Sequence, residues 1–107
     1  MNSRRKGAQY ERELAVRWRD SGLFAEARRG IGQTRSGSDV PDVDGTPYWI
    51  EAKRRKAHNV RAAMRQAVTA TDGRIPVVVA RWDGDSADDA LVCVRLADFE
   101  TLLRSGL

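Results

Sequence analysis

Three side chains near the middle of the chain have the types and spacing that metal-assisted hydrolysis requires. Glu51 comes nine residues after Asp42, and Lys53 comes two residues after Glu51. Two carboxylates held close together can bind Mg²⁺, which prefers oxygen ligands and retains bound waters. A lysine beside the metal can orient or deprotonate an attacking water, or stabilise charge on a phosphate. The pattern therefore indicates phosphodiester hydrolysis at a Mg²⁺ site, where Mn²⁺ is expected to substitute.

The residues around this triad predict a β-hairpin that brings the two carboxylates together. Residues 41–44 and 46–53 are the predicted strands, and Asp44-Gly45 is a strong signal for the turn between them. Because side chains alternate along a strand, the second strand should present Tyr48, Ile50 and Ala52 on one face and Trp49, Glu51 and Lys53 on the other. Both faces begin apolar, so we expect a central strand with the site at its end.

A fourth candidate, Glu11, comes from a predicted amphipathic helix over residues 8–21 that ends at Gly22. On a helical wheel Glu11 falls inside the apolar arc, whereas Glu13 falls outside it. The arc itself contains Tyr10, Leu14, Ala15 and Trp18. A glutamate in this arc faces the protein, so it either joins the site or has a structural role, such as an ion pair with Arg28.

The remaining pattern predicts a single α/β (α+β) domain over residues 1–107, with a mixed central sheet flanked by helices in the order α-β-β-β-α-β-β-α. The other predicted elements are a strand at 23–28, a loop at 29–40, a helix at 60–71 capped by Asn59, a strand at 76–82, an acidic loop at 83–89, a strand at 91–94 and a helix at 97–104. The three tryptophans, Trp18, Trp49 and Trp82, are expected in the core, Cys93 as a buried thiol and His58 at the surface.

Charge is distributed unevenly along the 107 residues, whose net charge is +4. Over residues 1–65 Lys and Arg outnumber Asp and Glu by 15 to 8, and over residues 66–107 they are outnumbered 4 to 7. Such a one-sided basic excess is typical of a nucleic-acid partner. One cysteine excludes an internal disulfide, and no apolar run approaches the ~20 residues of a membrane span. We expect a cytoplasmic protein, with no membrane and no organic cofactor involved.

Two motifs resemble a known nuclease family. Pro41-Asp42 followed by Glu51-Ala52-Lys53 resembles the PD-(D/E)XK nuclease signature, and the segment RKGAQYEREL, residues 5–14, resembles the opening helix of archaeal-type Holliday junction resolvases and their phage-encoded relatives. The resemblance covers residues 4–56. It implies a restriction-endonuclease-like core and a Mg²⁺-dependent endonuclease that cuts four-way DNA junctions symmetrically as a homodimer.

The family resemblance and the spacing together assign roles to individual residues. The catalytic centre would be Glu11, Asp42, Glu51 and Lys53, with the Ala52 carbonyl as a further metal ligand beside the carboxylates. Asp39 is an alternative to Asp42, but it lies in the loop and lacks the preceding proline. Contacts to DNA are expected from Arg5, Lys6, Arg12, Arg28, Arg29, Arg35, Ser36, Ser38, Arg54, Arg55 and Lys56. Gln66 is an auxiliary polar candidate on the second long helix.

Three other functions remain open at this level. The same core serves restriction, repair and phage DNA-processing nucleases that cut duplexes or flaps. A non-catalytic DNA-binding module is less favoured, because binding alone does not select two carboxylates that repel phosphate. A basic protein-interaction domain would show no salt-dependent affinity for DNA.

Overall fold

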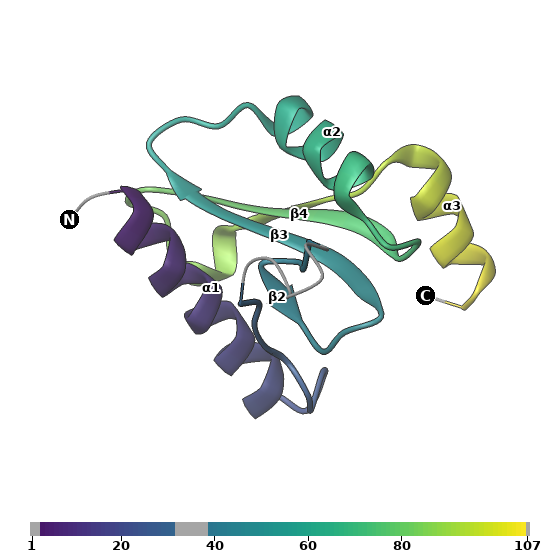
Figure 1. The fold of residues 1–107 in the computed structure, drawn as a ribbon, viewed down its shortest axis with the longest axis horizontal. Coiled ribbons are helices and arrows are strands. Elements are labelled where there is room, and N and C mark those ends of the chain that lie inside the picture. The colour runs from purple at the N-terminus through teal and green to yellow at the C-terminus, as the bar shows by residue number, and fades with distance from the viewer. Residues whose placement is uncertain (1–2, 32–38, 107) are drawn as a thin grey trace.

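The centre of the fold is a mixed five-stranded sheet with the strand order β1-β2-β3-β4-β5 (Figure 1). A computed structural model describes residues 3–31 and 39–106. In chain order its elements are α1 (Ser3–Asp20), β1 (Arg28–Arg29), β2 (Val43–Asp44), β3 (Tyr48–Arg55), α2 (Val60–Ala70), β4 (Ile75–Trp82), a 3₁₀ turn (Ala87–Asp89), β5 (Leu91–Cys93) and α3 (Leu96–Arg104). The predicted mixed sheet flanked by helices is therefore confirmed.

The two long strands, β3 and β4, lie parallel and are joined through α2. Their pairing extends from Tyr48 beside Ile75 to Arg55 beside Trp82. All other pairs in the sheet are antiparallel. β3 is the middle strand, as its two apolar faces predict, and its carboxyl end lies next to that of β4 beside the first turns of α1 (Figure 1). Side chains from three elements therefore gather at this end of the sheet.

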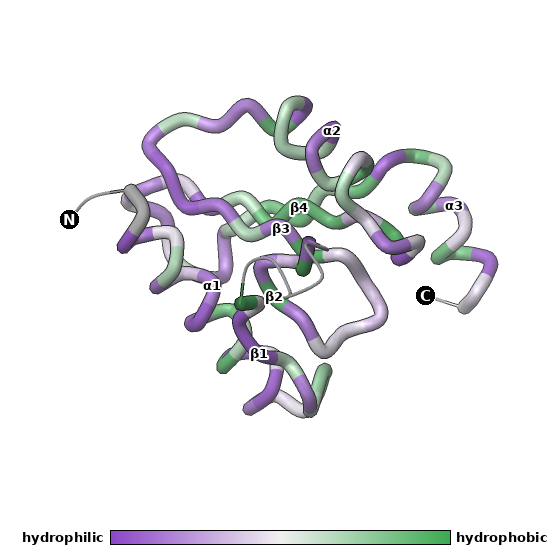
Figure 2. The backbone as a smooth tube through the Cα atoms, in the orientation of Figure 1, coloured by the Kyte–Doolittle hydropathy of each residue, from purple (hydrophilic) through white to green (hydrophobic). Residues whose placement is uncertain are grey.

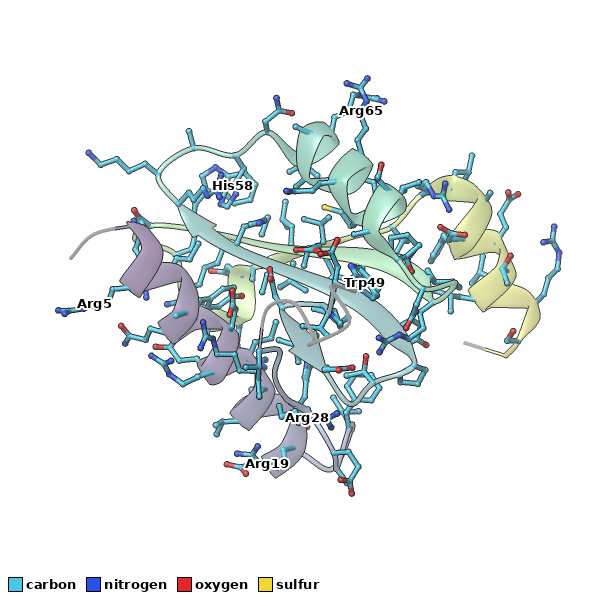
Figure 3. The ribbon with its side chains drawn as sticks, in the orientation of Figure 1. Arg5, Arg19, Arg28, Trp49, His58 and Arg65 are labelled. Carbon is cyan, nitrogen blue, oxygen red and sulfur yellow. The ribbon has the colours of Figure 1, made fainter. Side chains whose placement is uncertain are left out.

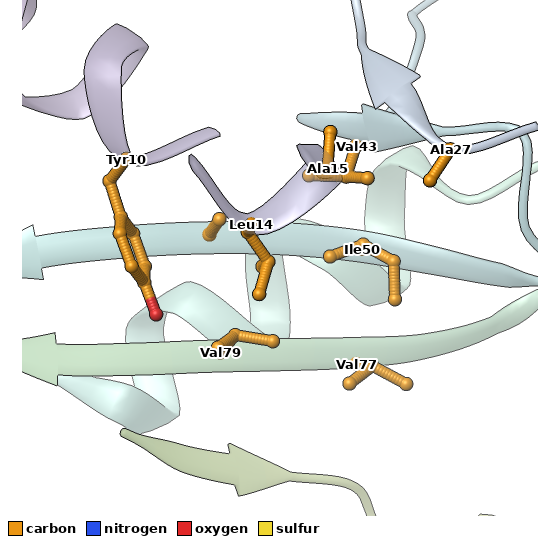
Figure 4. Close-up of a cluster of buried hydrophobic side chains, with 9 residues drawn as sticks. Tyr10, Leu14, Ala15, Ala27, Val43, Ile50, Val77 and Val79 are labelled. Carbon is orange, nitrogen blue, oxygen red and sulfur yellow. The ribbon is translucent and has the colours of Figure 1, made fainter. Parts of the chain in front are cut away.

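The core lies between α1 and one face of the sheet (Figure 4). From the helix it takes Tyr10, Leu14 and Ala15, which the wheel placed on one arc, and from the sheet it takes Val43, Ile50, Ala52, Val77 and Val79. Burial of this apolar surface fixes the rotation of α1 about its axis. The other side of α1 and the carboxyl end of β3 are strongly hydrophilic (Figure 2). Trp49, on the opposite face of β3, is also buried, as expected.

The strand predicted at 23–28 is wrong, since only Arg28–Arg29 pairs as β1. After Gly22, whose φ is 80°, the backbone is bonded locally. The N–H of Phe24 donates to the Trp18 carbonyl, and the N–H of Ala27 donates to the Phe24 carbonyl, each at 3.1 Å. Those groups are then not available to a neighbouring strand, although the side-chain pattern alternates.

The predicted hairpin forms, but its strands have different bounds. Regular pairing in β2 is confined to Val43–Asp44, because Pro41 has no N–H to donate. The Thr46 hydroxyl accepts from the N–H of Tyr48 and donates to its carbonyl, so β3 begins at Tyr48 and not at 46. Gly45 has a φ of 79°, and a side chain there would collide with the Glu26 carbonyl. Pairing with β4 extends β3 to Arg55, beyond the predicted end at 53.

The other boundaries differ by a few residues. The observed starts are Ser3 for α1, Ile75 for β4 and Leu96 for α3, and the observed ends are Asp20 for α1, Ala70 for α2 and Cys93 for β5. The Asn59 cap is confirmed, since its side chain accepts from the N–H of Ala62. Cys93 is half-buried and not fully enclosed. His58 is half-buried, because its ring packs edge-on against Trp82 and its Nε2 lies 2.8 Å from the Arg81 carbonyl.

Candidate active site

Asp42 is fixed against the backbone of the two neighbouring strands. Its N–H donates to the Ile50 carbonyl at 2.9 Å, and its own carbonyl accepts from the N–H of Gly30 at 2.8 Å. Its Oδ2 accepts from the N–H of Ala52 at 2.9 Å. The side chain is thereby directed from the residue before β2 toward Ala52 in the neighbouring strand β3. The second oxygen of this half-buried carboxylate does not take part in that contact.

Glu51 lies next to Asp42 and is 8% exposed. Its Oε1 accepts from Nε1 of Trp49 at 3.0 Å, and its Oε2 lies 4.0 Å from Nζ of Lys53. Burial raises the pKa of Glu51 to about 7, and both repulsion by the Asp42 carboxylate and a hydrogen bond between the two groups add to the shift. The hairpin therefore brings the acid, acid and lysine of the sequence pattern to one place.

Glu11 approaches the same place from α1. Its side chain is 16% exposed, in keeping with its position on the apolar arc, whereas that of Glu13 is 43% exposed. Its Oε2 accepts from Nε of Arg29 at 2.8 Å. Desolvation raises the pKa of Glu11 against the effect of Arg29, and the nearby Asp42 carboxylate raises it further. The alternative partner Arg28 instead lies 3.7 Å from Asp44.

A cavity of about 500 Å³ opens where these elements meet. Its walls come from α1, β1 and β3, namely Gly7, Ala8, Glu11, Arg29, Ala52, Lys53, Arg54 and Arg55. Among these lining residues Glu11 is acidic, and the other charged ones, Arg29, Lys53, Arg54 and Arg55, are basic. An anion such as a phosphate can therefore enter a mostly cationic space. Asp42 and Glu51 are not among the residues that line it; their neighbours Ala52 and Lys53 are.

The donor chemistry of the Asp42 and Glu51 pair fits a hard divalent cation. Two adjacent carboxylates that repel each other favour binding of a positive charge, and carboxylate oxygens are the protein ligands that Mg²⁺ prefers. Within residues 3–31 and 39–106 no three His, Cys, Asp or Glu side chains lie close enough to hold an ion by themselves. A cation here would thus complete its coordination with water, a backbone carbonyl such as that of Ala52, or substrate oxygens.

The cations predicted to contact DNA fall into two groups. Arg5, Arg12, Arg55 and Lys56 are exposed, and Arg5 projects away from the sheet (Figure 3). Lys6, Arg28, Arg29 and Arg54 form ion pairs with Asp83, Asp44, Glu11 and Asp83, respectively, and of these Arg28 and Arg29 are exposed as well. Arg35, Ser36 and Ser38 lie outside the described residues. Gln66 is exposed on α2 and does not line the cavity.

Two contacts of the site were not predicted from the sequence. Trp49 was expected only as a core residue, but its indole N–H also orients the Glu51 carboxylate. The signal for this contact is the spacing of two, which places both residues on one face of a strand. Asp83 was expected only as part of an acidic loop, yet it binds Lys6 at the start of α1. Its position directly after a buried strand was the available signal.

Comparison with known proteins gives no relative from which to transfer a function. No family model matches the chain, and neither a curated protein nor a solved structure shows significant similarity to it. None of the helices in the described part of the chain is both long and apolar enough to cross a membrane. The function must therefore be argued from the residues and their geometry.

Proposed function

We propose that this protein is a Mg²⁺-dependent DNA endonuclease of the PD-(D/E)XK type, with a restriction-endonuclease-like core. The observation that carries the proposal is the pair formed by the half-buried Asp42 and the buried Glu51, with Lys53 4.0 Å from Glu51. A binding module would gain nothing from two carboxylates at the place where phosphate must approach, whereas hydrolysis needs oxygen ligands and a positioned cation there.

In this proposal Asp42 and Glu51 hold the metal, which supplies charge neutralisation and an acidified water. Ala52 fixes Asp42 through its N–H, and Trp49 fixes Glu51, so neither carboxylate must reorganise when substrate arrives. Lys53 orients or deprotonates the attacking water, or stabilises the phosphate charge. Glu11 borders the site from α1 and is itself oriented by Arg29.

The finer proposal is a Holliday junction resolvase that acts as a homodimer. It rests on the resemblance of residues 4–56 to the resolvase family, within which Glu11 belongs to the opening helix. Symmetric cutting of a four-way junction requires two active sites related by a two-fold axis. Arg12, Arg55 and Lys56 are exposed on α1 and at the end of β3, where they can contact backbone phosphates.

A cleavage panel tests the function and the substrate together. Wild type and Glu51→Gln are incubated with a four-way junction, a flap, single-stranded DNA and plain duplex, each with Mg²⁺, with Mn²⁺ or with EDTA. We expect junction cutting by wild type in either metal, none in EDTA, and a loss of about 10³-fold or more for the variant. Equal cutting of plain duplex would reject the resolvase, and junction binding without any cutting would reject the nuclease.

A further inference from the structure

Asp83 lies directly after β4, where β4, the end of β3 and the start of α1 meet (Figure 1). Its N–H donates to the Arg55 carbonyl at 2.9 Å, which fixes its backbone to β3. Its Oδ2 accepts from Nζ of Lys6 at 2.7 Å, and its Oδ1 faces Nε of Arg54 at 3.6 Å. One carboxylate thus holds two cations that belong to different elements.

The contact with Arg54 is poorly suited to stabilising the fold. Arg54 Nε and Asp83 Oδ1 are both buried, and neither has a hydrogen-bond partner within the described residues. Burial of polar atoms without partners opposes folding. The effect of the arrangement is to hold Lys6 close to Arg54. Arg54 lines the cavity, and Lys6 directly precedes Gly7, which also lines it.

We propose that Asp83 is a positioning residue for DNA binding, because it keeps Lys6 and Arg54 ordered beside the cavity for contact with a backbone phosphate. This inference rests on the proposed nuclease function. Free lysine and arginine side chains lose much rotamer entropy when they bind a phosphate. Side chains that are ordered beforehand lose less, so the same contacts give a higher affinity.

Long-range electrostatics alone leads to the opposite expectation. Asp83 is an acidic group beside a site for a polyanion, so its neutralisation should strengthen DNA binding. The positioning role predicts weaker binding after the same change. The direction of the effect therefore distinguishes the two accounts without reference to its size.

The experiment compares Asp83→Asn with Asp89→Asn as a matched control. Asp89 belongs to the same acidic segment and bonds only to Ser86 and its own 3₁₀ turn among the described contacts, so its replacement removes the same charge without releasing a cation. Affinity for a fluorescent four-way junction is measured by anisotropy in EDTA. We expect Asp83→Asn to bind about tenfold more weakly than wild type, and Asp89→Asn to bind equally or more tightly.

A double-mutant cycle with Lys6→Met separates positioning from general loss of structure. Lys6→Met should weaken binding in the wild-type background and have little further effect when Asp83 is replaced. Melting curves verify that each variant is folded. If Asp83→Asn does not fold, Asp83→Glu takes its place, because the longer side chain keeps the charge but displaces the carboxylate, and the same weakening is expected.

The outcomes also separate this inference from the proposed function. Wild type that binds no DNA of any shape overturns both. Wild type that binds the junction, with Asp83→Asn binding as tightly or more tightly, overturns the positioning role alone. Independent effects of Lys6→Met and Asp83→Asn, which add in the double variant, overturn it as well.

Discussion

Burial of Glu51 beside Asp42 opposes folding near neutral pH and at the same time prepares an oxygen site for a cation. The folded protein holds the Glu51 proton more tightly than the unfolded chain, because the pKa is about 7 in place of 4.5. Stability therefore decreases as the pH rises from about 4.5 through 7, and the penalty is largest above pH 7. Natural active sites often combine function and strain in this way.

The first prediction follows from the loss of stability that the raised pKa of Glu51 causes as the pH rises. Without divalent metal, Glu51→Gln should increase the free energy of unfolding by roughly 3 kcal/mol at pH 8 and change it little at pH 4, at about 1.4 kcal/mol per pKa unit. The amide oxygen can still accept from Trp49. Denaturant titrations at the two pH values measure the difference, with the exposed Glu100→Gln as control. Destabilisation of Glu51→Gln at pH 8 would contradict the pKa argument.

At the residue scale, helical periodicity was sufficient to place Glu11, because a buried arc fixes the rotation of a helix. It could not identify the partner of Glu11. Arg29 forms that ion pair and Arg28 reaches Asp44, since adjacent residues of a strand point to opposite faces. The roles of Trp49 and Asp83 depended on contacts between β3, β4 and α1, whose relative positions no local pattern encodes.

Among the elements, the hairpin is attached to the loop before β4 through Arg74. Its Nη1 donates to Oδ1 of Asp44 at 2.9 Å and to the Thr46 carbonyl at 3.2 Å, and its guanidinium lies 5.3 Å from the centre of the Trp49 ring. Partial burial alone would raise the pKa of Asp44, but hydrogen bonds from Arg74 and the Gly45 N–H outweigh it and lower the pKa below 3.8. Arg74 thereby holds in place the turn of the hairpin that positions Asp42 and Glu51.

The second prediction concerns this support. The contribution of ionised Asp44 is fully present above pH 3.8 and is lost as the pH falls through its lower folded pKa. Asp44→Asn should cost about 1 kcal/mol of unfolding free energy at pH 7, and the cost should vanish in strong acid. Asp72→Asn is the control, because Asp72 bonds the same Arg74 from an exposed position. A cost for Asp44→Asn that does not change with pH would exclude the ion pair as its cause.

α3 differs from the other helices because it contains no buried residue. Leu96, Phe99 and Leu103 are 74%, 41% and 50% exposed. Helix stability in proteins comes mainly from packing, so α3 should open at a much lower free energy than β3 and β4.

The third prediction is that backbone amides of α3 exchange with solvent at least about 10²-fold faster than those at the centres of β3 and β4. Leu102→Ala should cost less than about 1 kcal/mol, whereas Ile50→Ala, in the core, should cost about 3 kcal/mol. Hydrogen exchange and denaturant titration provide the two measurements. Equal protection of α3 and β4 would show that α3 is covered in solution.

Element types were predicted well where tertiary packing and local pattern agree, as in α1, β3, α2 and β4. The failure at 23–28 has a physical reason, since alternation of side chains describes a strand but does not show whether its backbone groups are free to pair. The early start of α1 was missed because its first turns carry charge, and periodicity detects only the apolar part of a helix.

For the molecule as a whole, only part of the basic excess of residues 1–65 lies at the end of the sheet with the candidate site. Arg29, Lys53, Arg54 and Arg55 line the cavity there, whereas Arg19 and Arg28 lie toward the other end of α1 (Figure 3). The carboxyl ends of the parallel strands β3 and β4 meet at the end of the sheet with this site, and ligands of α/β sheets commonly bind at such ends. The proposed dimer would place two of these ends on one junction.

The fourth prediction tests two-site cutting. Wild type mixed and re-equilibrated with excess Glu51→Gln should form mixed dimers that nick one strand of the junction, so nicked product should accumulate at the expense of paired cuts. Product size on native and denaturing gels distinguishes the two. Glu100→Gln, which leaves the site intact, should leave paired cutting unchanged. A yield of paired cuts that falls only in proportion to dilution would indicate an active monomer.

The contacts of Gly30 with Pro41 and Asp42 indicate where the chain could tolerate changes of length during evolution. A side chain at Gly30 would collide with the Pro41 carbonyl, and the Gly30 N–H is bonded to the Asp42 carbonyl, so Gly30 and Pro41 are held side by side. Loop-closure entropy increases only slowly with length. A change in the number of residues between Gly30 and Pro41 should therefore cost little stability. If the proposed endonuclease function holds, such changes could alter its substrate while the hairpin stays the same.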